Sequence, residues 1–296
     1  MLKIVLPKGS LEKATLDLFE AADLSVVRSS SVDYKASIDD PRVAEVRILR
    51  PQEIATYVQE GLFDIGITGR DWIEETASEV VSLGELRYSK ATAQPVRVVV
   101  AVADSSSAQS AKDLKDGVRV TTEYPEMTRR YFANLGIKAD IRLSYGASEA
   151  KIPDIADCVV DITETGRALR AAGLRIIDTM LTSYTELIAN KESFADPVKR
   201  HAMEQIMTLL TGTLEARDKV LLKLNVSENA MANLAWNDIK LPNPVFVGDT
   251  LWCESEVLEK RESSSSPYVG IVGIHSRGLN QRKEVICEFR RTMMIY

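Results

Sequence analysis

Residues 161–168, Asp-Ile-Thr-Glu-Thr-Gly-Arg-Ala, bring two hydroxyls, a glycine and two carboxylates into one short stretch. The apolar residues 158–160 before it predict a strand, and residues 168–172 predict a helix. A Thr-x-Thr-Gly turn at a helix N-terminus directs unpaired backbone amides and hydroxyls at one point, where the helix dipole also favours an anion. The pattern predicts a phosphate-binding loop. The alternative is an ordinary β-turn-α connection with a threonine N-cap.

Two carboxylates beside this loop narrow the kind of ligand. Asp161 and Glu164 would repel a bare phosphate, because like charges repel. They suit a ligand that also carries hydroxyl groups or a Mg²⁺ ion. A sugar phosphate such as phosphoribosyl pyrophosphate meets both demands.

The elements before the loop follow a βαβ rhythm. Strands are predicted at 4–6, 43–49 and 64–67, with a helix over 11–22 that Ser10 caps and a helix from Pro51 at N1 to about residue 60. Alternating strands and helices indicate an α/β fold with parallel or mixed sheets. A second lobe starts near the buried strand 96–100, and the chain returns to the first lobe through 184–189 and a helix from 197 to about 217. Two lobes joined by two crossings place a site in the cleft between them.

The pattern changes after Asn233. Long alternating strands are predicted at 250–261, 269–277 and 284–296, with turns at 263–267 and 280–283. These strands predict a small antiparallel β segment. The predicted domains are residues 1–95 plus 180–226 as lobe I, 96–179 as lobe II, and 227–296 as a C-terminal β-rich domain.

Bulk properties exclude several classes of protein. A net charge of −6 argues against a general nucleic-acid binder. No apolar run approaches the roughly 20 residues of a membrane span, and the N-terminus lacks a signal-peptide pattern. Three widely spaced cysteines indicate neither a disulfide framework nor a zinc site. We expect a cytoplasmic protein with no membrane or nucleic-acid partner.

A series of ordered motifs identifies a family. They are residues 2–11 (Leu-Lys-Ile-Val-Leu-Pro-Lys-Gly-Ser-Leu), 48–51 (Ile-Leu-Arg-Pro), 61–69 (Gly-Leu-Phe-Asp-Ile-Gly-Ile-Thr-Gly), 122–125 (Thr-Glu-Tyr-Pro), 145–154, 161–169 and 178–190. From Met1 to about Val226 the chain resembles ATP phosphoribosyltransferase in its long form, the first enzyme of histidine biosynthesis. The resemblance implies a two-lobed catalytic region like a periplasmic binding protein.

The resemblance also implies a reaction and its residues. Phosphoribosyl passes from phosphoribosyl pyrophosphate to N1 of ATP, which gives phosphoribosyl-ATP and pyrophosphate. The cofactor is Mg²⁺, whose ligands the sequence does not assign, and the assembly is a homo-oligomer, either a dimer or a hexamer. The implied catalytic residues are Lys8, Arg50, Glu149 and Asp161. The implied substrate-binding residues are Asp64, Gly66, Thr68, Gly69, Glu123, Tyr124, Thr163, Glu164, Thr165, Gly166, Arg167 and Ala168.

Some of these residues have plainer interpretations. Lys8 is alternatively a solvated charge after a strand, and Arg50 a partner of Glu53. Tyr124, before Pro125, is alternatively a packed turn aromatic. Trp72 is interpreted as core or lobe packing. His201 and His275 are expected to be surface or structural residues.

The C-terminal segment departs from the long form, which continues into a ferredoxin-like regulatory domain. The C-terminal segment of this chain contains other motifs, at residues 230–242, 244–251, 259–263 and 277–282. They resemble the C-terminal half of a MaoC-like hot-dog enoyl-CoA hydratase, without the half that carries that family's catalytic Asp/His pair. Two alternative functions remain: a two-lobed module that binds small anions without catalysis, and an acyl-CoA-related function of the tail.

Overall fold

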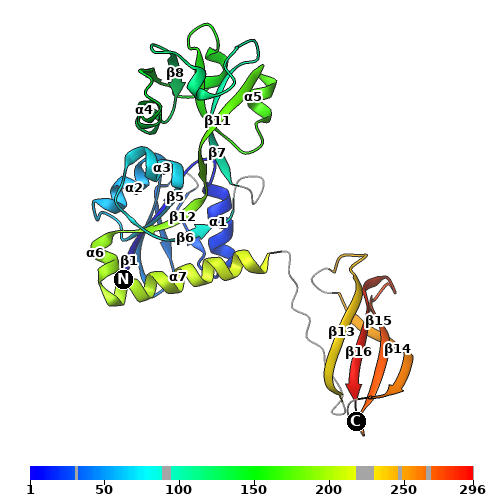
Figure 1. The fold of residues 1–296 in the computed structure, drawn as a ribbon. Coiled ribbons are helices and arrows are strands. Elements are labelled where there is room, and N and C mark those ends of the chain that lie inside the picture. The colour runs from blue at the N-terminus through cyan, green and yellow to red at the C-terminus, as the bar shows by residue number, and fades with distance from the viewer. Residues whose placement is uncertain (31–32, 89–94, 218–229, 246–248, 265–267, 296) are drawn as a thin grey trace. The chain divides into compact units, whose positions relative to one another are not determined.

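The computed structural model describes residues 1–30, 33–88, 95–217, 230–245, 249–264 and 268–295. The chain divides into two compact units, Met1–Lys219 and Val220–Tyr296 (Figure 1). No helix in the described ranges combines the length and apolar character needed to cross a membrane.

The first unit holds two sheets, and each defines a lobe. Lobe I is built on a seven-stranded sheet of order β2-β3-β4-β1-β5-β12-β6. Its strands are β1 (Leu2–Pro7), β2 (Val26–Val27), β3 (Lys35–Ile38), β4 (Val43–Leu49), β5 (Ile65–Gly69), β6 (Val81–Leu86) and β12 (Thr185–Ala189). Its helices are α1 (Glu12–Ala21), α2 (Pro51–Gln59), α3 (Arg70–Thr76), α6 (Lys191–Ala195) and α7 (Pro197–Ala216).

The central strands of lobe I are apolar on both faces because helices cover both faces. β1 pairs in parallel with β4 and β5, and β12 runs antiparallel to β5 and β6. α2 packs on β1 and β5, while α7 packs on α1, β1 and β6. A Cβ atom on Gly66 would come within 2.7–2.9 Å of side chains of Ile54, Val5 and Val58. Only glycine therefore permits α2 to approach β5 so closely.

Lobe II is built on a five-stranded sheet of order β11-β7-β10-β8-β9. Its strands are β7 (Val96–Ala103), β8 (Arg119–Thr122), β9 (Asp140–Leu143), β10 (Cys158–Thr163) and β11 (Leu174–Ser183). Its helices are η1 (Ala111–Asp113), α4 (Pro125–Asn134), η2 (Ser148–Lys151) and α5 (Arg167–Ala171). The chain leaves lobe I between β6 and β7 and returns between β11 and β12 (Figure 1).

The second unit is a four-stranded antiparallel sheet of order β13-β16-β15-β14. Its strands are β13 (Ala230–Lys240), β14 (Leu251–Glu262), β15 (Gly270–Asn280) and β16 (Val285–Ile295). The turn before β16 closes on Asn280, whose Oδ1 accepts the amides of Arg282 at 2.9 Å and Glu284 at 3.1 Å. The predicted turn at 263–267 lies partly outside the described residues.

The predicted fold class, two-lobed α/β followed by a small antiparallel β segment, is confirmed. Two local predictions are wrong. Ser10 does not cap the first helix, which begins at Glu12 after Leu11 with no side-chain cap. Strand β13 was not predicted, because its alanine, asparagine and aspartate residues have low strand propensity.

Candidate active site

A cleft of about 420 Å³ lies between the lobes of the first unit. Both lobes line it. From lobe I and the returning segment come Lys8, Gly9, Ser10, Leu11, Arg50, Pro51, Gln52, Gly69, Asp71, Trp72, Arg87, Tyr88, Tyr184 and Thr185. From lobe II come Pro95, Val96, Glu123, Tyr124, Ile162, Thr163, Glu164 and Ser183.

Strand register brings the first two cations together. β1 and β4 are parallel with Pro7 opposite Leu49, so the residues that follow them, Lys8 and Arg50, emerge at the same sheet edge. The Lys8 amide donates to the Leu49 carbonyl at 2.7 Å, which fixes this edge. The expected clustering of Lys8 and Arg50 therefore follows from the parallel pairing.

Neither cation makes an ion pair with any residue in the described ranges. The Lys8 amine lies 3.9 Å from the centre of the Tyr34 ring. Glu53, the alternative partner of Arg50, instead accepts the Tyr57 hydroxyl at 3.1 Å. Arg87 adds a third cation that the sequence did not indicate, and it lies over the Tyr184 ring and beside Glu85. Lobe I thus presents positive charge to the cleft.

The predicted phosphate loop begins inside a strand. β10 continues through Thr163, and α5 begins at Arg167 after Gly166, whose φ of +71° is a left-handed conformation that favours glycine. The Thr163 Oγ1 accepts the Gly166 amide at 2.8 Å, and the Thr165 Oγ1 accepts the Arg167 amide at 3.4 Å. Thr163 and Glu164 line the cleft, whereas the other four loop residues are not among its lining residues.

Three carboxylates gather at the end of the lobe II sheet. β8 pairs in parallel with β10 and ends opposite Val160, so Glu123 emerges beside Asp161. η2, which carries Glu149, contacts both β8 and β10. Burial, together with the charges of Glu123 and Glu149, raises the pKa of Asp161 to about 6. Glu123 lines the cleft, whereas Asp161 and Glu149 are not among its lining residues.

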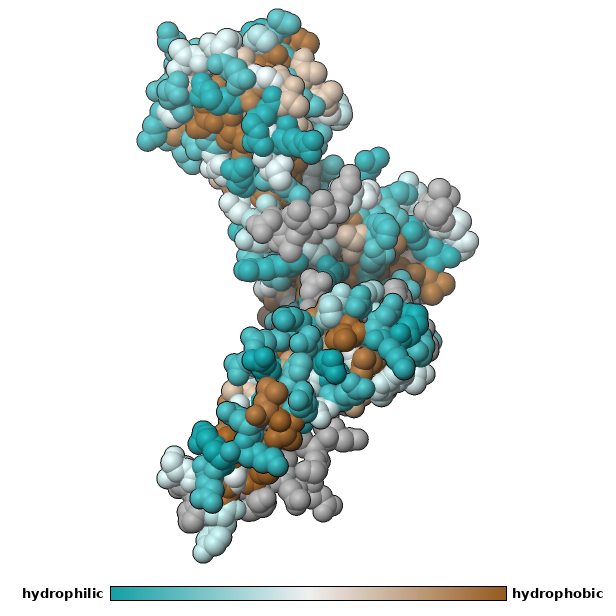
Figure 2. Space-filling model, turned by 90° about the vertical axis from the view of Figure 1, so that its right-hand side faces the viewer, coloured by the Kyte–Doolittle hydropathy of each residue, from teal (hydrophilic) through white to brown (hydrophobic). Residues whose placement is uncertain are grey.

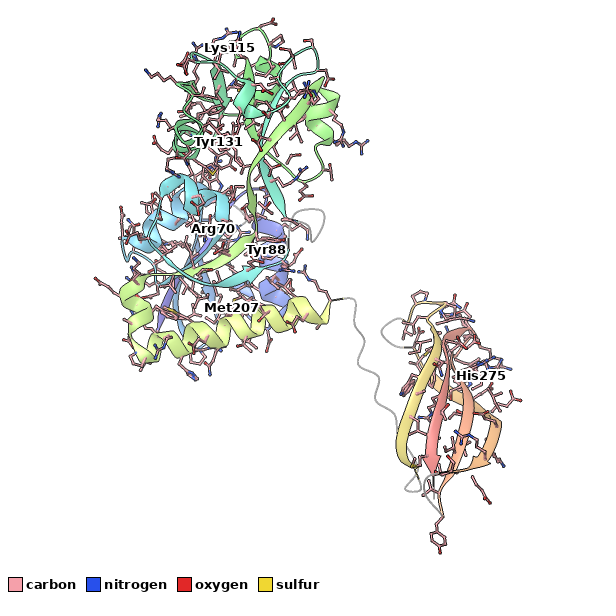
Figure 3. All side chains as sticks on the ribbon, viewed as in Figure 1. Arg70, Tyr88, Lys115, Tyr131, Met207 and His275 are labelled. Carbon is pink, nitrogen blue, oxygen red and sulfur yellow. The ribbon has the colours of Figure 1, made fainter. Side chains whose placement is uncertain are left out.

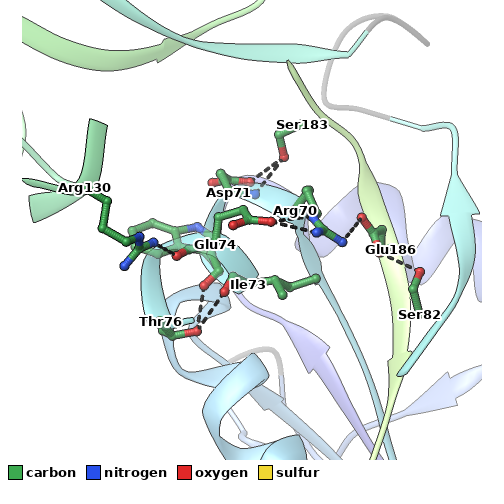
Figure 4. A network of polar contacts seen from close by, with 10 residues as sticks. Arg70, Asp71, Ile73, Glu74, Thr76, Ser82, Arg130, Ser183 and Glu186 are labelled. Carbon is green, nitrogen blue, oxygen red and sulfur yellow. Dashed lines mark hydrogen bonds and ion pairs between the residues drawn. The ribbon is translucent and has the colours of Figure 1, made fainter. Parts of the chain in front are cut away.

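A buried polar network joins the lobes at the back of the cleft. Asp71, at the start of α3, accepts the Tyr124 hydroxyl at 2.8 Å and the Ser183 hydroxyl at 2.7 Å. Figure 4 shows the Ser183 contact at Asp71. Trp72 stacks on Tyr124 with ring centres 4.6 Å apart. Trp72 therefore packs between the lobes, and it also lines the cleft.

Three residues implied by the resemblance lie away from the cleft. Asp64 is 6% exposed and accepts hydrogen bonds from Lys199 at 2.7 Å and Ser193 at 2.6 Å. Gly66 serves the packing of α2, and the Thr68 hydroxyl donates to the Pro51 carbonyl at 2.9 Å. Only Gly69 of this strand lines the cleft.

Neither histidine lies at the cleft. His201 on α7 contacts Gln205 at 3.1 Å. His275, labelled in Figure 3, belongs to the second unit and contacts Glu288 at 3.0 Å. The cleft therefore offers charges and backbone groups rather than a histidine base.

Comparisons with known proteins identify the family. The family HisG: ATP phosphoribosyltransferase matches residues 50–212. An ATP phosphoribosyltransferase of Chlorobium chlorochromatii is 46% identical over 261 residues, which cover 87% of each chain. The chain belongs to the ATP phosphoribosyltransferase family. The predicted enzyme class and activity, the first step of histidine biosynthesis, are confirmed.

Solved structures agree for the first unit. An ATP phosphoribosyl transferase (HisG:HisZ) complex from Thermotoga maritima is 26% identical, with a TM-score of 0.62, and covers 73% of this chain and 99% of that chain. The alignment with the Chlorobium relative spans 261 residues, which is more than the first 226 residues contain. The alignment therefore continues into the second unit. A MaoC domain protein dehydratase from Chloroflexus aurantiacus is 37% identical over 24% of this chain and 20% of that chain, with a TM-score of 0.23. The hot-dog resemblance of the second unit stays a prediction.

Proposed function

We propose that the cleft of Met1–Lys219 transfers phosphoribosyl from phosphoribosyl pyrophosphate to N1 of ATP. The bond from C1′ to the pyrophosphate oxygen breaks, the bond from C1′ to N1 forms, and pyrophosphate leaves. One observation carries the proposal: three cations of lobe I, Lys8, Arg50 and Arg87, line the same cleft as Glu123 and Glu164 of lobe II. Asp71, a lobe I carboxylate that also lines the cleft, accepts the Tyr124 and Ser183 hydroxyls.

The different charges of the two lobes support a proposal for which substrate groups each lobe binds. The phosphate loop of lobe II, residues 163–168, is proposed to hold the 5′-phosphate through backbone amides, and the Gly166 and Arg167 amides would exchange the Thr163 and Thr165 hydroxyls for phosphate oxygens. Glu123, which lines the cleft, and Asp161, which precedes the cleft-lining Ile162, are proposed to bind the ribose hydroxyls. Lys8 and Arg50, which have no ion-pair partner in the described part of the chain, bind the pyrophosphate and triphosphate oxygens.

Catalysis by this site works through positioning and electrostatics. Positive charge builds at C1′ and the ring oxygen in the transition state, and negative charge builds on the leaving group. The carboxylates of lobe II stabilise the first charge, and the cations of lobe I stabilise the second. With a pKa of about 6, Asp161 is mostly ionised at neutral pH. It can therefore take part as a carboxylate.

Mg²⁺ fits this site as an ion that arrives with the pyrophosphate. Among the described residues, no three Asp, Glu, His or Cys side chains are grouped so that they could hold a metal by themselves. Mg²⁺ typically keeps water and substrate phosphate ligands and takes only one or two carboxylates. Glu123 and Glu164 line the cleft and supply such oxygens. The ion neutralises charge on the leaving pyrophosphate.

The protein is proposed to act as a cytoplasmic homo-oligomer. Cys158, Cys253 and Cys287 are all free thiols, which suits a reducing compartment. Sedimentation velocity measures the assembly, and a monomer at micromolar concentration contradicts this part of the proposal.

One assay separates the proposed enzyme from an anion-binding module. The full chain is incubated with ATP, phosphoribosyl pyrophosphate and Mg²⁺, and phosphoribosyl-ATP is followed by its near-ultraviolet absorbance. Turnover that needs all three supports transfer. Binding of phosphoribosyl pyrophosphate without turnover would show a binding module.

A further inference from the structure

Helix α3 of lobe I reaches into lobe II. It packs against α4 and β11, both of lobe II. Figure 4 shows its Glu74 carbonyl accepting from the Arg130 guanidinium of α4. In Figure 3, Arg70 marks the side of lobe I that faces lobe II, and Tyr131 marks the facing side of lobe II.

Glu75 makes the most specific of these contacts. Its side chain is buried, with the residue 8% exposed, and its two oxygens accept the amides of Glu126 at 2.9 Å and Met127 at 2.8 Å. These amides are the second and third of α4, where the helix has no partners of its own. Tyr124, the N-cap residue, supplies no side-chain cap. A carboxylate from lobe I therefore caps a helix of lobe II, where the helix dipole also favours negative charge.

Asp71 lies one turn before Glu75 on the same helix. It holds Tyr124 through the hydroxyl contact described above, and Tyr124 follows Glu123 in the cleft wall. The position of Glu123 relative to Lys8 and Arg50 is therefore set through α3. Glu75 itself is not among the residues that line the cleft.

We propose that Glu75 is a positioning residue for the phosphoribosyl transfer: by capping α4 it holds the two lobes in the orientation that brings both substrates together. The proposal rests on the transfer reaction proposed above. Each substrate keeps its own contacts when the cap is lost, but the reacting atoms lose their alignment. Loss of alignment lowers kcat rather than the affinity for either substrate alone.

The test uses the full chain with Glu75→Gln and the matched control Glu74→Gln. The glutamine amide group turns one acceptor into a donor that faces a backbone amide. Glu74 lies on the same helix, but its carboxylate pairs with Arg70 of that helix at 2.7 Å. Its bond with Arg130 of lobe II is made by the backbone carbonyl, which the substitution keeps. We expect Glu75→Gln to lower kcat at least about tenfold, with the Kd for phosphoribosyl pyrophosphate within about threefold, and Glu74→Gln to match wild type.

A distance measurement separates positioning from general destabilisation. Spin labels at Lys13→Cys and Lys115→Cys, with Cys253 and Cys287 changed to serine, report the separation of the lobes. We expect a broader distance distribution in Glu75→Gln, and a distribution or kcat that matches wild type overturns the proposal. If Glu75→Gln does not fold, Glu75→Asp, which keeps the charge but shortens the reach, is judged by the same two criteria. If the wild-type chain shows no turnover, the proposed transfer reaction is refuted. The spin-label distances still test whether Glu75 holds the two lobes in one orientation.

Discussion

The two units of the chain treat their buried polar groups differently. In the first unit the buried carboxylates of Asp64, Asp71 and Glu75 each accept at least two hydrogen bonds. In the second unit the Nε and Nη1 atoms of Arg291 are buried without a hydrogen-bond partner in the described residues. An unpaired buried guanidinium costs stability. Among its described residues the first unit leaves one buried hydroxyl, Thr128 Oγ1, without a hydrogen-bond partner, whereas the second unit leaves two nitrogens of a charged group, which lies over the Trp236 ring.

The second unit also exposes apolar side chains along an edge strand. Edge strand β14 is exposed at every position, including Leu251, Trp252, Val257 and Leu258. Figure 2 shows apolar side chains at the surface of this unit. A long exposed edge strand usually needs pairing or cover. The comparison teaches that the residues lining the cleft belong to the first unit, whereas the second unit leaves an edge strand with apolar side chains exposed.

The largest expected effect is the loss of turnover without Mg²⁺. The carboxylates of lobe II and the pyrophosphate repel each other unless a cation lies between them. In excess chelator the full chain and a chain ending near Val226 should both lose turnover. Added Mg²⁺ should restore it, and turnover in chelator would contradict the electrostatic scheme.

A change in the phosphate loop should come next in size. Gly166→Val places a branched side chain at a φ of +71°, 2.9 Å from the Arg170 guanidinium. We expect kcat/KM for phosphoribosyl pyrophosphate to fall by about 100-fold, because the backbone no longer approaches the phosphate. Thr165→Ala should cost less, because its hydrogen bond to the Arg167 amide is long at 3.4 Å. Near-wild-type kcat/KM for Gly166→Val in a titration at saturating ATP would refute the loop's role.

Asp161 should trade stability for activity. Burial is the main reason that the pKa of Asp161 in the folded protein is raised to about 6, so protonation of Asp161 stabilises the folded state. The stabilisation is complete below the unfolded pKa and is lost as pH rises through about 6. Asp161→Asn should therefore raise the free energy of unfolding above pH 6, by about 3 kcal/mol at most.

The same substitution should lower activity at least about tenfold, because the ribose loses a carboxylate. Wild-type kcat/KM for phosphoribosyl pyrophosphate should fall as pH drops below about 6, and this step should be absent in Asp161→Asn. Denaturant titrations and rate profiles from pH 5 to 8 measure both effects. A variant that is both less stable and fully active would contradict the assignment.

The sequence predicted the parts of the site that depend on neighbouring residues. Apolar periodicity located β1, β4, β5 and β7, and Pro51 marked the start of α2. Shorter strands such as β2, β3 and β9 were not predicted. Lys8 and Arg50 follow strands that pair in parallel, so their convergence was expected once the sheet was parallel.

Contacts between distant segments were not predictable in this way. Asp71 and Arg87 lie outside the quoted motifs, and nothing in their neighbouring residues marks them as part of the cleft. Asp64 sits in a matching motif, yet its partner Lys199 lies 135 residues further on, in α7. A motif shared with a family thus holds structural residues beside those that line the cleft.

Removal of the second unit should have a small effect on the rate. The first unit has its own core, and every residue that lines the cleft belongs to it. A chain ending near Val226 should keep kcat within about threefold of the full chain, as expected when a substitution or deletion leaves the reacting groups untouched. A loss of 100-fold or more with a folded first unit would show that the second unit supports the cleft.

The smallest expected effect is that of free histidine. A distant site slows catalysis only if a ligand binds it and favours one state of the enzyme. Feedback inhibition in the long form depends on a ferredoxin-like domain, whereas the second unit here is a four-stranded antiparallel sheet with no helix among its described residues. We therefore expect weak inhibition or none, and any competition at the cleft should yield to substrate. Turnover at rising histidine, with calorimetric titration of the full chain and of a chain ending near Val226, measures this. Because the alignment with the Chlorobium relative continues into the second unit, this measurement tests whether that unit is regulatory. Tight, non-competitive inhibition that disappears on truncation would show that the second unit is regulatory.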